Sequence, residues 1–351
     1  MRFWRMRAKE NKMSVVKKIS VLSVLLFLPQ MASALDYNTG RFSFRLTGYG
    51  TSGVIEPDFE STLFIGDWRV RGQAKYNMSS GTLGAVYALD EAALDKGNLS
   101  REIFAFMELD GVGRIELGLT DSVARKLGVG LPDVGGLRIN DRPIYNEKII
   151  PDDAVIADTT LTSGRRAPRV NLVTTTDDGT QYGVSFAGLT SDYDWTADFG
   201  MKLRNSSGKL KTAYSFGASF ISRPDDFDAE VYTPGVTADW RAQMSLGMNV
   251  QYNSWLFGLT SRVIYDQNPV GPISDGFVLG TGASYDLLKY SVSLTYMFSD
   301  TGVWQSDVND FYDHTVVASF RYKYSEFVDG WISGGVTSET PFVSAGLRVT
   351  F

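Results

Sequence analysis

An uninterrupted alternation of apolar and polar side chains runs from Trp240 to Tyr252. The even-numbered positions hold Trp, Ala, Met, Leu, Met, Val and Tyr, whereas the odd-numbered positions hold Arg, Gln, Ser, Gly, Asn and Gln. A period of two belongs to a β-strand whose two faces meet different surroundings. Strands of soluble proteins are usually about 5 or 6 residues long. Alternation over 13 residues, with aromatic residues at both ends, therefore indicates a tilted strand that crosses a membrane.

Similar segments recur along the chain between clusters of Gly, Asn, Asp and Ser. The sixteen candidates are 41–50, 63–77, 82–90, 101–110, 113–120, 168–176, 180–189, 195–204, 209–221, 237–252, 254–265, 276–286, 289–298, 312–324, 330–338 and 341–351. Connections after even-numbered segments are short, whereas those after odd-numbered segments, such as 51–62 and 121–167, are mostly long. Short turns at one end and long loops at the other are typical of outer-membrane barrels. The predicted fold class is all-β, a transmembrane antiparallel β-barrel of about 16 strands.

The first 34 residues form a secretory signal pattern. A short basic region at 13–18 precedes an apolar run from Ile19 to Leu28 and an A-x-A cleavage site at 32–34. A transmembrane anchor is the less favoured alternative, because the apolar run is about half the length of a membrane-spanning helix. We expect residues 1–34 to be removed, leaving a single barrel over 35–351, and we expect the true start codon to encode Met13.

Composition excludes several classes of function. The chain has no cysteine and one histidine, His314, so it cannot form a disulfide, a thiolate metal site or a histidine metal cluster, and we expect no cofactor. Residues 1–34 carry seven basic residues and one acid, so their removal takes the net charge from −6 to −12. Nucleic-acid binding is not expected of such an acidic exported chain.

The last segment alternates up to the final residue, Phe351. In this ending the sequence resembles the Gram-negative general porin family, whose 16-stranded barrels close with an amphipathic strand ending in Phe. The stretch 101–109, followed by 113–118, is similar to the family's fourth and fifth strands around a short turn. The family often has Gly-Arg at the end of the fifth strand, where this chain has Gly118-Leu119, so one expected pore arginine is absent.

The resemblance implies a homotrimeric porin in the outer membrane of a Gram-negative bacterium. Its function would be a water-filled channel for passive diffusion of ions and small hydrophilic solutes. Phe351 would be the assembly signal, with periplasmic chaperones, the barrel-assembly machinery, outer-membrane lipid and lipopolysaccharide as partners. The segment 101–110 is apolar on both faces, which favours contact with a neighbouring subunit outside and with an infolded loop inside.

Basic residues concentrate on the predicted inner face of the first two strands. A barrel of about 16 strands encloses water, so inward positions are expected to be polar. The candidate basic wall comprises Arg41, Arg45, Arg69, Arg71 and Lys75, with Arg114 on the fifth strand. The alternative is that inward positions are polar by default and the clustering is chance.

The connection 121–167 is much longer than an ordinary loop. By resemblance, this third loop folds into the lumen as a constriction loop whose acids oppose the basic wall; an extracellular flap is the alternative. The candidate acids are Asp121, Asp133, Asp141, Glu147, Asp152 and Asp153. The arginines favour anions and the net charge favours cations, and the expectation is weak cation selectivity.

Two other classes of function were weighed. A substrate-specific outer-membrane channel is the nearer alternative, and a barrel enzyme is the more distant one. An enzyme would need a base near a nucleophile, and His314, the single imidazole, falls near the outer end of a strand. Its replacement is expected to leave function intact. The acidic loop 223–230 could bind a divalent cation or bridge lipopolysaccharide, although a solvated loop is favoured.

Overall fold

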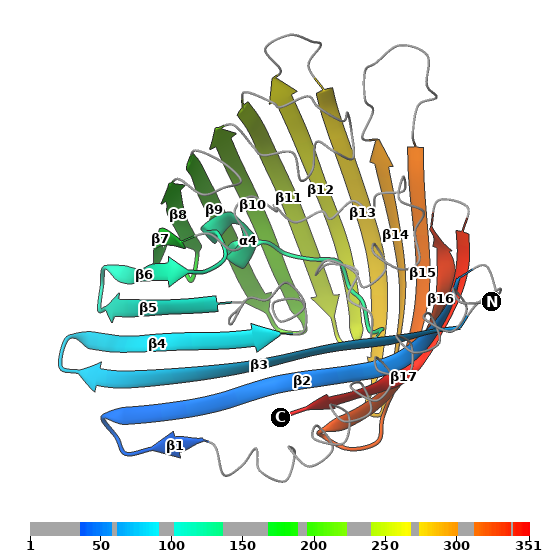
Figure 1. Ribbon diagram of the computed structural model, residues 1–351, viewed down its shortest axis with the longest axis horizontal. Helices are drawn as coiled ribbons and strands as arrows, with labels where there is room; N and C mark the ends of the chain where they lie inside the picture. Colours follow the sequence, from blue (N-terminus) through cyan, green and yellow to red (C-terminus); the bar gives the residue numbers. More distant parts are fainter. Residues whose placement is uncertain are drawn as a thin grey trace, which may run out of the picture.

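The strands close into a single barrel. The computed structural model describes residues 36–57, 62–90, 102–135, 168–188, 195–222, 240–267, 274–300, 312–337 and 340–351. Within these ranges, strands β2 to β17 pair in chain order, every pair is antiparallel, and β17 pairs back with β2 (Figure 1). The prediction of an antiparallel β-barrel of about 16 strands is confirmed. The predicted signal 1–34 and the acidic loop 223–230 lie outside the described residues.

The observed elements follow the predicted segments closely. The strands are β1 (Tyr37–Asn38), β2 (Phe42–Pro57), β3 (Leu63–Met78), β4 (Gly81–Asp90), β5 (Glu102–Leu109), β6 (Gly113–Leu119), β7 (Pro168–Thr175), β8 (Gln181–Gly188), β9 (Trp195–Ser207), β10 (Leu210–Ser222), β11 (Trp240–Tyr252), β12 (Trp255–Gln267), β13 (Ser274–Leu287), β14 (Tyr290–Asp300), β15 (Tyr312–Lys323), β16 (Val328–Thr337) and β17 (Thr340–Thr350), with one short helix, α4 (Val123–Leu127). Among the described residues, no helix combines the length and apolar character needed to cross a membrane.

One predicted connection is wrong in its extent. Residues 51–62 were expected to form a long loop, but β2 continues to Pro57 and pairs with β17 as far as that residue. Small and polar residues at 51–53 conceal the alternation, which resumes when Ile55 is buried on the inner side. The pairing of β2 with β17 therefore extends the strand beyond what its local pattern indicates.

Burial in the barrel is inverted relative to a soluble protein. On β12 the outward-facing Trp255, Phe257 and Leu259 are 45%, 48% and 44% exposed, whereas the inward-facing Thr260 and Arg262 are 2% and 6% exposed. Apolar side chains that face outward in this way suit lipid, which is the surrounding expected for the outer surface of a membrane barrel.

Aromatic side chains gather at both ends of the outer surface. At the loop ends, Trp195 stacks on Phe220 and Phe220 on Trp240, with ring centroids 5.1 and 5.6 Å apart. At the short-turn ends, Trp255 contacts Tyr285 at a centroid distance of 4.6 Å. Two such belts are typical of the two membrane interfaces, and the short turns mark the periplasmic end.

The two ends of the described chain share one edge of β2. Phe351 N donates to Gly48 O (3.0 Å) and Gly48 N donates to Phe351 O (2.8 Å). Further along β2, Tyr37 of β1 pairs with Phe44. Strand β1 was not predicted, because two residues carry no detectable period. Phe351 thus closes the barrel seam, and its role as an assembly signal remains a prediction.

Candidate functional site: the inner wall of the barrel

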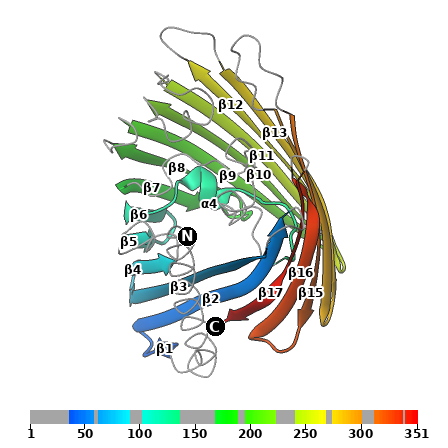
Figure 2. The ribbon, with the colours of Figure 1, turned by 45° about the vertical axis from the view of Figure 1, so that its right-hand side comes forward.

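Residues 121–135, here named the inner segment, leave β6 and run along the inside of the barrel. Figures 1 and 2 show α4, which begins this segment, inside the ring of strands. Backbone N–H groups of the inner segment donate to inward-facing serines of the wall. Val123 donates to Ser185 on β8, Val129 to Ser215 on β10 and Val134 to Ser293 on β14 (3.2, 3.0 and 3.1 Å). At its far end, Arg348 on β17 donates to Gly135 O (3.3 Å). The inner segment therefore follows the wall from β8 to β17.

Glycines on the inner face allow this close approach. A Cβ atom at Gly200 on β9 would lie 2.7 Å from Val123 O, and one at Gly258 on β12 would lie 2.4 Å from Pro132 Cδ. Real Cβ contacts are not this short, so any side chain here would displace the inner segment. Within the segment, Val123, Ala124 and Leu127 of α4 are buried. The wall is thus shaped to receive the segment by steric fit as well as by hydrogen bonds.

A disulfide would test the far end of the inner segment. A Cβ atom at Gly135 would lie 2.7 Å from Ser333 Oγ on β16, and a disulfide places each Cβ about 3.0 Å from the opposite sulfur. In this cysteine-free chain, the double variant Gly135→Cys/Ser333→Cys is expected to cross-link on mild oxidation, as read by peptide mapping. Channel conductance should not change when the bond is reduced, because the segment already lies there.

The matched control pairs Gly135→Cys with Ser207→Cys, which lies at the β9–β10 end of the barrel. This control should stay reduced and react fully with maleimide. Equal maleimide labelling of both double variants would contradict the described position of the inner segment.

Two residues of the predicted basic wall, Arg69 and Arg71, interact with the same carboxylate. Arg69 Nη2 lies 3.0 Å and Arg71 Nε 3.9 Å from Glu102 Oε2. Glu102 comes from β5, two strands away, and its side chain is 8% exposed. The structure therefore places Arg69 and Arg71 side by side on β3, with their charge partly neutralised from the wall itself.

Arg114 lies in a second charged cluster, around Glu116. Arg114 Nε donates to Glu116 Oε1 (2.9 Å), Asn171 Nδ2 donates to Glu116 Oε2 (2.8 Å), and Lys126 Nζ forms a short hydrogen bond with the same carboxylate. The Arg114 guanidinium also covers the Phe106 ring, 3.9 Å from its centroid. Glu116 thus joins β6, β7 and α4, and it fixes the start of the inner segment.

A third ion pair is completely buried. Arg169 Nη1 on β7 lies 3.1 Å from Asp198 Oδ2 on β9, and both side chains are 0% exposed. Ser185 donates to the same carboxylate oxygen (3.0 Å) and accepts the N–H of Val123. In the sheet, Arg169 is the register partner of Gly118, the residue before Leu119, which stands where the family often has arginine. The Arg169 guanidinium binds Asp198 within the wall, and Ser185 links this pair to α4.

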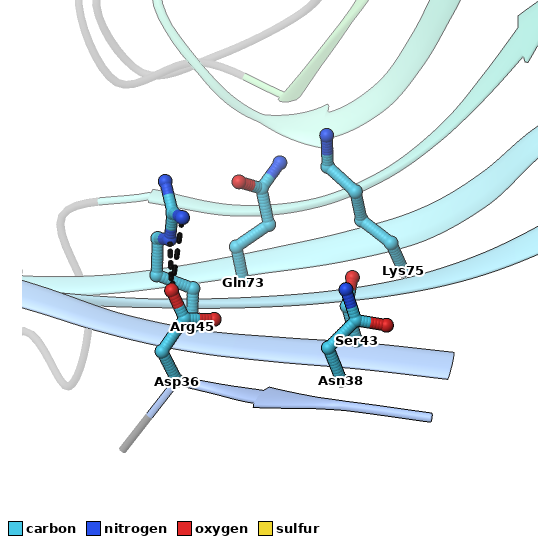
Figure 3. Close-up of a pocket in the computed structure, with 6 residues that line it drawn as sticks. All are labelled: Asp36, Asn38, Ser43, Arg45, Gln73 and Lys75. Atoms are coloured by element: carbon cyan, nitrogen blue, oxygen red, sulfur yellow. Dashed lines mark hydrogen bonds and ion pairs between the residues drawn. The ribbon is translucent and has the colours of Figure 1, made fainter. Parts of the chain in front are cut away.

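Two other residues of the predicted basic wall, Arg45 and Lys75, line a pocket of about 190 Å³ near the short-turn end. Arg45 Nη2 pairs there with Asp36 Oδ2 (2.9 Å), and Gln73 and Lys75 of β3 line the pocket beside them (Figure 3). Arg41 lies just before β2 and is exposed. All six predicted basic residues are therefore described: Arg69, Arg71 and Arg114 lie close enough for their charges to interact, Arg45 and Lys75 line the pocket, and Arg41 is exposed.

Two of the predicted loop acids, Asp121 and Asp133, are described, and both make contacts within the inner segment. Asp121 lies 3.7 Å from Arg125 of the same segment, and Asp133 accepts hydrogen bonds from Gly135 N (2.8 Å) and Ser319 Oγ (3.4 Å). The remaining predicted acids, Asp141, Glu147, Asp152 and Asp153, lie outside the described residues. Whether the loop as a whole constricts the lumen stays a prediction.

His314 lies on the outer surface among aromatic rings. Its Nδ1 is 2.8 Å from Tyr296 Oη, and its ring centroid is 5.1 Å from that of Phe298. This position near the start of β15 agrees with the interfacial location expected from the sequence. In the described ranges, no group of three or more potential metal ligands occurs.

Sequence reasoning missed Glu102 and Glu116 as lumen residues. A signal for both was present: Glu102 shares the strand phase of the buried Phe104 and Phe106, and Glu116 shares the phase of Arg114. Assigning each strand a definite inward phase would have placed both carboxylates beside the arginines.

A barrel whose inner wall carries charged side chains and a folded-in segment has counterparts among known proteins. The profile of Gram-negative porins matches residues 21–329. The chain belongs to the Gram-negative porin family. This porin is an outer-membrane diffusion channel, as the resemblance implied. A search of curated protein sequences gave no match.

Solved structures share the porin's fold at low sequence identity. The trimer form of OmpT, an outer membrane protein of Vibrio cholerae, is 12% identical with a TM-score of 0.65, covering 89% of this chain and 100% of that one. Salmonella typhi OmpF in complex with daunomycin is 12% identical with a TM-score of 0.65, covering 90% and 99%. The anion-selective porin of Comamonas acidovorans is 13% identical with a TM-score of 0.63, covering 88% and 100%. These TM-scores, over most of each chain, establish the common fold.

Proposed function

We propose that solutes cross this porin between the inner segment and the basic wall, and that the loop 121–167 forms the constriction. The supporting observation is the path of the inner segment, which is hydrogen-bonded to the wall from β8 to β17. That path covers one side of the lumen and leaves β2 and β3, with Arg69 and Arg71, facing it across the barrel. The passage is thereby reduced in width and lined with positive charge.

We infer that the passage prefers anions, although the chain is acidic overall. The inward-facing Glu102, Glu116 and Asp198 each pair with a cation, whereas Glu108, which also faces inward, forms no ion pair with any described residue. Lys75 and Lys202 form no ion pair with any described residue either, and the next inward-facing residue on β9 after Lys202 is another cation, Arg204. The local field in the lumen governs selectivity more directly than net charge does.

We propose that the porin is a homotrimer whose subunits meet at β5–β8. These strands are 8, 7, 8 and 8 residues long, against 16 for β2 and β3. A tilted strand of 8 residues rises only about 20 Å, which is less than the apolar band of about 25 Å. Their outward face is nevertheless apolar, with Ile103, Leu117 and Phe186 all more than half exposed. A neighbouring subunit would cover the apolar outward face of these four short strands.

We propose diffusion, and no catalysis, as the activity. The one histidine lies on the lipid-facing surface, away from the charged lumen groups. The variant His314→Gln is accordingly expected to conduct like the parent protein.

The test is single-channel recording from refolded protein in a planar bilayer under a salt gradient. Openings should appear in groups of three, and the reversal potential should have the sign of an anion-selective pore. A folded, heat-modifiable barrel that shows no conductance would contradict the open channel. Single openings would contradict the trimer, and a cation-selective reversal potential would contradict the charge argument.

A further inference from the structure

A polar pocket lies at the periplasmic end of the lumen, apart from the inner segment and its ion pairs. Six side chains line it: Asp36 and Asn38 from β1 and the residue before it, Ser43 and Arg45 from β2, and Gln73 and Lys75 from β3. The register places Ser43 opposite both Asn38 and Lys75, and Arg45 opposite Gln73. The pocket therefore occupies the inner face of three adjacent strands.

Several polar groups in this pocket are unused by the fold. Gln73 and Lys75 form no hydrogen bond or ion pair with any described residue, and they extend in the same direction, away from β1 (Figure 3). Asp36 uses Oδ2 to accept from Arg45 Nε and Nη2 (3.2 and 2.9 Å), which leaves Oδ1 available. Donors on β3 thus lie beside a carboxylate, an amide and a hydroxyl that come from the β1–β2 side of the pocket.

The charge of the pocket favours an anion. Arg45 and Lys75 contribute two positive charges and Asp36 one negative charge, and Arg71 follows one inward position beyond Gln73 on β3. The nearest carboxylate on the other side, Glu108, lies two strands from Lys75 and closer to the short turns. A solute carboxylate or phosphate would therefore meet Lys75 and the Gln73 amide as charge-assisted donors.

The remaining groups favour hydroxyls over an aromatic ring. Asp36 and Ser43 offer acceptors that solute hydroxyls could satisfy, whereas Asn38 Oδ1 already accepts from Gly40 N (2.9 Å) and leaves its amide N–H groups as donors. The nearby aromatic residues Tyr37 and Phe42 point outward, 57% and 41% exposed, and none of the six lining side chains is aromatic. We propose that this pocket binds small hydroxylated anions of the sugar-acid class and acts as their binding site at the periplasmic mouth. The proposal rests on the channel function and names a solute class for it.

The test is block of the potassium chloride current by gluconate added to the periplasmic side of the open channel. Gluconate should reduce the conductance in a saturable way, whereas glucose, which lacks the charge, and propionate, which lacks the hydroxyls, should not saturate in the same range. In Lys75→Gln the half-blocking concentration should rise about tenfold, because one charge-assisted hydrogen bond is lost.

The matched control is Lys211→Gln, which removes the same charge from the inner face of β10 near the same end of the barrel. Its half-blocking concentration should stay within about twofold of the parent value. Equal effects of the two variants would overturn the pocket in favour of a general field. An open channel that gluconate does not block would overturn the pocket and leave the channel function standing, and a folded barrel without current would overturn both.

Discussion

Replacing Glu116 by glutamine is expected to destabilise the barrel by about 3 kcal/mol and to increase anion selectivity. The carboxylate is 4% exposed and is shared by Arg114 and Lys126. Removing one partner of a buried ion pair costs about 3–5 kcal/mol, and the lower value applies because both cations keep 23% of their side-chain area exposed. The substitution also removes one negative charge from the lumen, so the net charge of the lumen wall rises by one unit. The midpoint of heat unfolding on gels and the reversal potential measure the two effects.

Glu108→Gln is the matched control for this prediction. Glu108 faces the lumen on β5 and is exposed, and its cross-strand neighbour is also Arg114. The control removes the same charge, so it should shift the reversal potential in the same direction, but its unfolding free energy should change by no more than about 0.5 kcal/mol. If the two variants lose the same stability, Glu116 does not have the joining role described for it.

Asp198→Asn is expected to destabilise the barrel by about 3–5 kcal/mol. The substitution removes the carboxylate charge from a pair in which both Arg169 and Asp198 are fully buried. Ser185, which links the pair to α4, would lose its charged acceptor as well. Heat-unfolding midpoints, or urea titration of protein in lipid vesicles, would measure the loss.

The exposed pair at the periplasmic mouth supplies the control. Asp36 and Arg45 form the same type of contact at 2.9 Å, but their side chains are 48% and 64% exposed. Surface pairs contribute about 0–1 kcal/mol, so Asp36→Asn should leave the unfolding midpoint almost unchanged. A small loss for Asp198→Asn, similar to that for Asp36→Asn, would show that burial does not set the strength of these pairs.

The wall of this porin was largely predictable because its signal is local. Each strand carries its own alternation, and a segment such as 240–252 indicates its length and both faces without reference to any other part of the chain. The predicted strand bounds were wrong where pairing with a neighbouring strand, and not the local sequence pattern, determines where a strand begins or ends. The outer part of β2 lacks clear alternation and is held by β17, and the two residues of β1 are held by β2.

The interior was less predictable because its contacts are distant in sequence. The Arg348 guanidinium reaches the Gly135 carbonyl across 213 residues, and Thr295 Oγ1 donates to the Pro132 carbonyl across 163. No local pattern around 121–135 indicates that it will follow the wall. The candidate basic residues were placed on the inner face by their phase, but their partners, Glu102 and Glu116, depend on which strands become neighbours.

The shared edge of β2 has a consequence for the connectivity of the chain. Phe351 lies opposite Gly48, and the register of β1 continued by one residue places Asp36 opposite Arg45. Both segments run in the same direction along that edge, with two residues of β2 between them. A short peptide could therefore join Phe351 to Asp36 as one continuous strand. New ends could then be opened at a periplasmic turn such as that between β10 and β9, giving a circularly permuted porin with the same barrel.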